Sequence, residues 1–84
     1  MSPADEKALN VLTAMLILAP TQWPGIISDA RRFACTPAMR GALDALADAY
    51  AEGPADPLAV VARLRDGGHL AAANALHWNA GRLG

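Results

Sequence analysis

The feature that most constrains the fold of this 84-residue chain is a helix-start signal that occurs three times. Ser2-Pro3, Thr36-Pro37 and Asp56-Pro57 each place a short polar side chain directly before proline. Such a side chain accepts a hydrogen bond from the free N–H groups of a first helical turn, and proline fits the first helical position because no N–H is needed there. The three pairs therefore predict three helix N-termini.

Helix-breaking residues divide the rest of the chain. Pro20, Gly53 and the pair Gly67-Gly68 are expected to end helices. A short additional helix is expected to be capped by Thr21 and to end near Arg31-Arg32, where positive charge suits a helix C-terminus.

A last helix is expected from about Leu70 to Ala80, and no segment has the alternating pattern of a strand. The connections between the predicted helices are short. The predicted fold class is therefore all-α, a compact orthogonal bundle of about five short helices, with residues 1–84 forming a single domain.

Apolar residues at helical spacing predict which face of each helix enters the core. The first helix has two neighbouring apolar stripes, which are Leu9, Leu12, Leu16 and Ala19, and Val11, Met15 and Leu18. A surface this wide predicts a central helix covered on two sides. Phe33 is expected to plug the loop after the second helix. The other residues predicted to face inward are Ile26, Ile27, Leu43, Leu46, Ala47, Tyr50, Leu58, Val61, Leu64, Leu70, Ala73 and Leu76.

The residue types that catalysis, nucleotide binding or metal binding requires do not form a known motif in this sequence. Lys7 is the only lysine and no nucleotide-binding loop is present. His69 and His77 lack the further ligands of a zinc site, and Cys35 lacks an identifiable base, so a structural thiol is expected there. We therefore expect no catalysis, no cofactor, no metal and no small-molecule substrate.

Charged residues are mixed along the chain, and the net charge is −1. Because no predicted helix has an exposed basic face, direct sequence-specific binding of nucleic acid is not expected. Asp44, Asp48 and Glu52 form an acidic stripe, with Arg40 four residues before Asp44. This stripe is interpreted as a solvated face, with docking of a basic partner as the alternative.

A membrane location is not expected, because the apolar run Met15 to Ala19 is far too short to span a bilayer. The start of the chain is acidic where a secretory signal is basic, and a single cysteine cannot form an internal disulfide. The expected location is cytoplasmic.

Trp78 lies at the edge of the apolar stripe of the last helix. Its ring either closes the end of the bundle or anchors a partner, as tryptophans often do at interfaces. The alanines of the same helix (Ala71, Ala72 and Ala75) would let another helix approach closely. The residues predicted to form a partner interface on the first and last helices are Trp78, Leu76, Leu12, Met15 and Leu16.

Read in order, residues from about Glu6 to Trp78 resemble the N-terminal domain of DnaB-type replicative DNA helicases. The resemblance begins with the helix Ala8–Leu16 and continues with Arg32-Phe33 after a short helix. It then includes Gly53-Pro54-Ala55-Asp56 and the segment Val60–Leu70, which contains the Gly67-Gly68 pair. Trp78 falls where the family often has a tyrosine.

The resemblance implies a protein-protein interaction module of DNA replication. Such a module is expected to form a dimer or another homo-oligomer and to dock primase, helicase or loader proteins in a primosome. The sequence departs from the family at Ala34, where a tyrosine is usual, and it contains neither the ATPase domain nor the long helical hairpin. The alternative is a small phage or bacterial regulatory protein that binds a protein or DNA partner.

Overall fold

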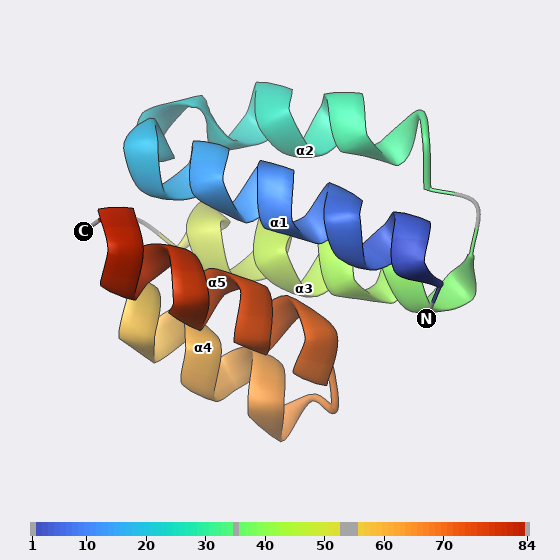
Figure 1. Ribbon diagram of the computed structural model, residues 1–84. Helices are drawn as coiled ribbons and strands as arrows, with labels where there is room; N and C mark the ends of the chain where they lie inside the picture. The colour runs from blue at the N-terminus through green and yellow to red at the C-terminus, as the bar shows by residue number, and fades with distance from the viewer. Residues whose placement is uncertain (1, 35, 53–55, 84) are drawn as a thin grey trace.

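The structure consists of five α-helices and one short 3₁₀ helix over residues 2–34, 36–52 and 56–83, the part of the chain that this computed structural model describes (Figure 1). The elements are α1 (Pro3–Leu18), η1 (Pro20–Gln22), α2 (Trp23–Arg31), α3 (Pro37–Ala51), α4 (Pro57–Asp66) and α5 (Leu70–Leu83). These ranges contain no strand, and they fold into a body of 28 × 22 × 21 Å. The predicted all-α fold class is confirmed.

All three predicted cap-proline pairs begin helices. The Ser2 hydroxyl accepts a hydrogen bond from the backbone N–H three residues later (3.2 Å), and the Thr36 hydroxyl does the same (3.1 Å). The Asp56 carboxylate accepts from the N–H two residues later (3.2 Å). Each bond satisfies an N–H group that the helix itself leaves without a partner.

Of three other predicted helix boundaries, one is wrong, one is confirmed and one lies outside the described residues. Thr21 does not cap the second helix, because the chain first forms η1 and Gln22 becomes the N-cap of α2 without a side-chain bond. Gly67 ends α4, and Gly68 has a φ of +80°, a left-handed conformation that glycine adopts without strain. The predicted stop at Gly53 lies outside the described residues.

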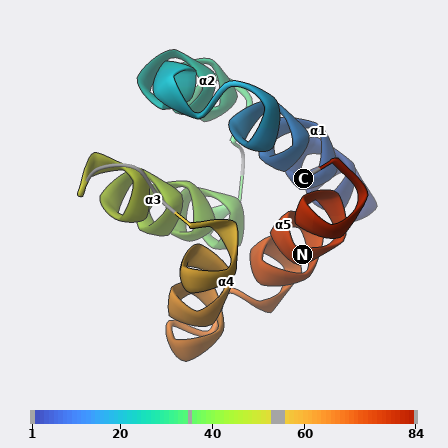
Figure 2. The same cartoon turned by 90° about the vertical axis from the view of Figure 1, so that its left-hand side faces the viewer.

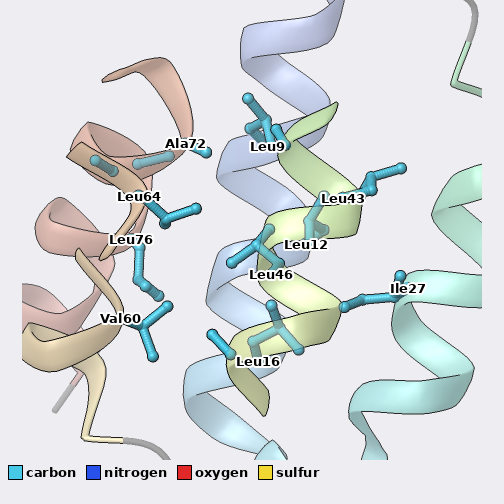
Figure 3. Close-up of a cluster of buried hydrophobic side chains, with 14 of the residues drawn as sticks. Leu9, Leu12, Leu16, Ile27, Leu43, Leu46, Val60, Leu64, Ala72 and Leu76 are labelled. Atoms are coloured by element: carbon cyan, nitrogen blue, oxygen red, sulfur yellow. The ribbon is translucent and has the colours of Figure 1, made fainter. Parts of the chain in front are cut away.

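The five helices form a closed ring around the core (Figure 2). Each helix contacts the next one along the chain. The last helix, α5, also packs along α1 and so closes the ring. Leucines from α1, α3, α4 and α5 and Ile27 of α2 fill the centre of the ring (Figure 3). The largest fully buried apolar side chains are Leu9, Leu16, Ile27, Leu43, Leu46, Leu64 and Leu76.

Three predicted inward-facing residues are exposed instead. The inner face of α4 is formed by Val60, Val61 and Leu64, and Leu58 lies about 100° around the helix from that face. Leu70 is exposed for the same reason, because alanines and Leu76 form the buried face of α5. Phe33 does not plug its loop, since 77% of its surface is exposed.

Two sides of α1 are covered, by α5 and by the η1–α2 segment, but the second of its two apolar stripes is not among the covered residues. The stripe with Leu9, Leu12 and Leu16 is buried, but the neighbouring stripe faces solvent. Its exposed side chains are Val11 (57%), Met15 (46%) and Leu18 (68%). Among the described elements, α5, α2 and η1 pack on α1, and none of them covers this second stripe.

A buried polar network joins α1 to α5. The Asn79 side-chain amide of α5 donates hydrogen bonds to the Asn10 carbonyl (2.9 Å) and to the Thr13 hydroxyl (2.8 Å). The Thr13 hydroxyl in turn donates to the Leu9 carbonyl (2.6 Å), and Arg82 donates to the Asn79 side-chain oxygen (3.1 Å). Thr13 and Asn79 are almost completely buried, so the network fixes the register of the two helices.

Burial of Tyr50 in α3 leads to a prediction for alkaline pH. Burial raises the pKa of the Tyr50 phenol above 10.0, because the phenolate is poorly solvated there. The folded chain therefore holds this proton more tightly than the unfolded chain, and stability should be constant below pH 10 and fall as the pH rises through the folded pKa. Urea unfolding between pH 8 and pH 11 should show this loss, and Tyr50→Phe should reduce it.

Candidate interaction groove

An apolar groove lies between α1 and α2. It has a volume of about 630 Å³ and is open to solvent. The chain turns by 119° between α1 and the η1–α2 segment, so the two helices diverge from their shared corner. The first turn of α3 closes the base of the groove. The lining residues are Ser2, Ala4, Asp5, Ala8, Val11, Leu12, Met15, Ile26, Asp29, Ala30, Phe33, Thr36 and Met39.

The sequence of α1 explains why the groove exists. Ala4 and Ala8 present only methyl groups toward α2, which leaves space that a larger side chain would fill. The buried side chains of Leu12, Ile26 and Met39 form the floor. The groove is therefore a hollow with an apolar base, the usual character of a binding site.

The exposed apolar residues of α1 continue along this groove. Ala4, Ala8, Val11, Met15 and Leu18 are separated by four, three, four and three residues, and all five are exposed. This spacing keeps them on one side of the helix. We call these five residues the outer stripe of α1.

The charged residues that line the groove are both acidic, Asp5 and Asp29. Asp5 is nearly buried, and its carboxylate accepts a hydrogen bond from the Thr36 hydroxyl (2.8 Å), which ties the start of α1 to the start of α3. Asp29 is exposed on the α2 wall. The groove thus combines an apolar base with one accessible negative charge.

The structure separates the five residues that were predicted to form a partner interface. Met15 is exposed and lines the groove, and Trp78 is 63% exposed on α5. Leu12, Leu16 and Leu76 are instead buried in the core, with exposed fractions of 4% or less. Leu12 nevertheless lies on the floor of the groove, whereas Leu16 and Leu76 do not line it.

Trp78 lies in another, smaller hollow that Met15 does not line. This hollow of about 330 Å³ is lined by His77, Trp78, Gly81 and Arg82, and the Arg82 guanidinium lies 5.9 Å from the centre of the Trp78 ring. The ring therefore does not close the end of the bundle. The alanine face of the same helix is already occupied, since Ala72 and Ala75 are buried and α5 packs along α1.

The other residues considered for catalysis or metal binding do not come together in one site among the described residues. Asp44 accepts a hydrogen bond from Arg31 (2.5 Å) and Glu52 accepts one from Arg63 (2.6 Å), so two members of the acidic stripe belong to exposed ion pairs. His69 packs beside Gly41 and Gly67. Among the described residues, no three His, Cys, Asp or Glu side chains are grouped as metal ligands. Cys35 lies outside the described residues.

The groove was not anticipated from the sequence. The signal that could have revealed it is the four-three spacing of the outer stripe together with the small side chains of Ala4 and Ala8. In residues 2–34, 36–52 and 56–83, no single helix is long and apolar enough to cross a membrane. The combined segment of α1, η1 and α2 meets these criteria only as a pair bent by 119°.

Comparison with protein-family models, with curated proteins and with solved structures finds no match to this chain.

Proposed function

We propose that this chain is a protein-interaction module whose α1–α2 groove receives a segment of another polypeptide. The observation that carries this proposal is the gathering of exposed apolar side chains, Val11, Met15 and Phe33, around one groove with a buried apolar floor. Exposed apolar surface that is contiguous and hollowed is typical of protein–protein contact sites.

The resemblance to the N-terminal domain of replicative helicases supports a more specific setting. In this setting the module belongs to DNA replication, associates with copies of itself and docks primase, helicase or loader proteins, and its own residues carry out no catalysis. The series of residues on which the resemblance rests includes Asp56 and Gly67, which are the N-cap and the C-cap of α4.

Direct DNA binding as a regulatory protein is the alternative. It requires free basic side chains on one helix face, but Arg31 and Arg63 are already held in ion pairs with carboxylates. A salt-dependent gel shift by the purified chain would favour this alternative.

Replacing Met15 with glutamate is expected to weaken partner binding at least tenfold without unfolding the chain. The variant places a charge on the apolar wall of the groove, and that charge would have to lose its water when a partner packs against it. Binding should be measured by isothermal titration calorimetry with the purified helicase and primase of the organism that encodes the chain.

Leu70→Glu is the matched control, because Leu70 is also exposed and does not line the groove. This control should bind as the original chain does, and circular dichroism should show that both variants remain helical. A chain that stays strictly monomeric in light scattering and binds neither protein would contradict the proposal.

A further inference from the structure

We infer that the groove receives an amphipathic helix of a partner protein, with apolar side chains at heptad spacing and a flanking Lys or Arg that reaches Asp29. The inference rests on the proposed function and specifies the chemistry of the bound segment. It follows from the spacing of the outer stripe, the shape of the groove and the sign of its charge.

The spacing of the outer stripe favours a helix as the occupant. Residues separated alternately by four and three positions form the seam along which two helices interlock their side chains. The stripe runs from Ala4 to Leu18, nearly the whole length of α1, and this 16-residue helix is about 24 Å long. A partner helix of about four turns would match that length.

The shape of the groove indicates how the partner's side chains are arranged. Ala4 and Ala8 leave the most space along the α1 wall of the groove, which Leu12 and Met39 also line. Bulky partner residues such as Leu or Phe fit here, because they would fill the space that the alanines leave. Smaller partner residues suit the other end of the stripe, where Leu18 extends outward.

The charge of the groove selects a basic partner. Asp5 is nearly buried and bonded to Thr36, which leaves Asp29 as the accessible charge on the groove walls. Within the described ranges of the chain, Asp29 has no ion-pair partner, whereas nearby Arg31 is held by Asp44 of α3. A Lys or Arg beside the partner's apolar stripe would therefore be attracted, and a Glu there would be repelled.

Two labelled helical peptides of about 18 residues provide the test. Both carry Leu at the a and d positions, and they differ only in having Lys or Glu at the flanking e and g positions. In fluorescence anisotropy at low ionic strength, the Lys peptide should bind about fivefold more tightly than the Glu peptide, and the difference should shrink as salt is added.

Asp29→Lys should reverse the preference between the two peptides. Asp48→Lys is the matched control, because it makes the same charge change at an exposed position on α3 outside the groove and should leave the preference unchanged. Met15→Glu should weaken the binding of both peptides.

Other occupants give different results. If the two peptides bind equally and Met15→Glu abolishes the binding of both, the inference is wrong, but the groove remains a protein-binding site. A dimer in sedimentation equilibrium that Val11→Glu dissociates, and that excludes both peptides, would assign the groove to a second copy and overturn the inference. If neither peptide binds, the inference is wrong, and calorimetry with the purified replication proteins decides the proposed function separately.

Discussion

Leu16→Ala is expected to destabilise the folded chain by about 2–5 kcal/mol, whereas Met15→Ala should change its stability by less than about 1 kcal/mol. The two residues are neighbours in α1, but Leu16 is fully buried and Met15 is about half exposed. Truncating Leu16 removes buried apolar surface and leaves a cavity among leucines that come from other helices.

The size of this loss is large for a domain of 84 residues, which has a total stability of about 4–13 kcal/mol. Urea unfolding monitored by circular dichroism should show a much lower midpoint for Leu16→Ala at an unchanged slope. Equal destabilisation by the two variants would mean that Met15 is covered, and the outer stripe would then not be a surface.

Asn79→Ala is expected to lower the free energy of unfolding by about 1–3 kcal/mol, equivalent to a fall in Tm of roughly 5–20 °C. The substitution removes the hydrogen bonds that the Asn79 amide donates to the Asn10 carbonyl and to the buried Thr13 hydroxyl. A buried polar group that loses its hydrogen-bond partner destabilises the folded state, because no bond then compensates for its removal from water.

The control for this variant is Asn74→Ala, which makes the same change at an exposed position of α5. Differential scanning calorimetry should show little change in Tm for Asn74→Ala. A Tm for Asn79→Ala within a few degrees of the original chain would show that the α1–α5 network contributes little to the stability of the bundle.

The helix boundaries were largely predictable from the sequence because caps act locally. Ser2, Thr36 and Asp56 each bond to a backbone N–H within three residues, so a short stretch of sequence contains both partners. Thr21 failed as a cap because Pro20 begins a 3₁₀ turn there, and α2 then starts only after Gln22.

The core was predictable where each helix has one apolar face, as in α3 with Leu43 and Leu46. It was not predictable for α1, which has two apolar stripes. Periodicity identifies apolar stripes but does not say how many neighbouring helices cover them. The α1–α5 network could not be predicted either, because Thr13 and Asn79 are 66 residues apart in sequence.

The candidate site was predictable only in part. Met15 and Trp78 are exposed, but the other three residues predicted for the interface, Leu12, Leu16 and Leu76, are buried. These three residues are leucines, and a small domain needs its most apolar residues for the core. The groove itself depends on the angle between α1 and α2, which no local pattern specifies.

Methyl NMR of ¹³C-labelled methionine tests the central claim most directly, because Met15 lies on the groove wall and Met39 on its floor. Upon titration with a purified partner, helicase or primase, the Met15 methyl signal should shift or broaden at the same partner concentration at which calorimetry detects binding. Binding that leaves the signals of both Met15 and Met39 unchanged would contradict the claim that the α1–α2 groove is the interaction site.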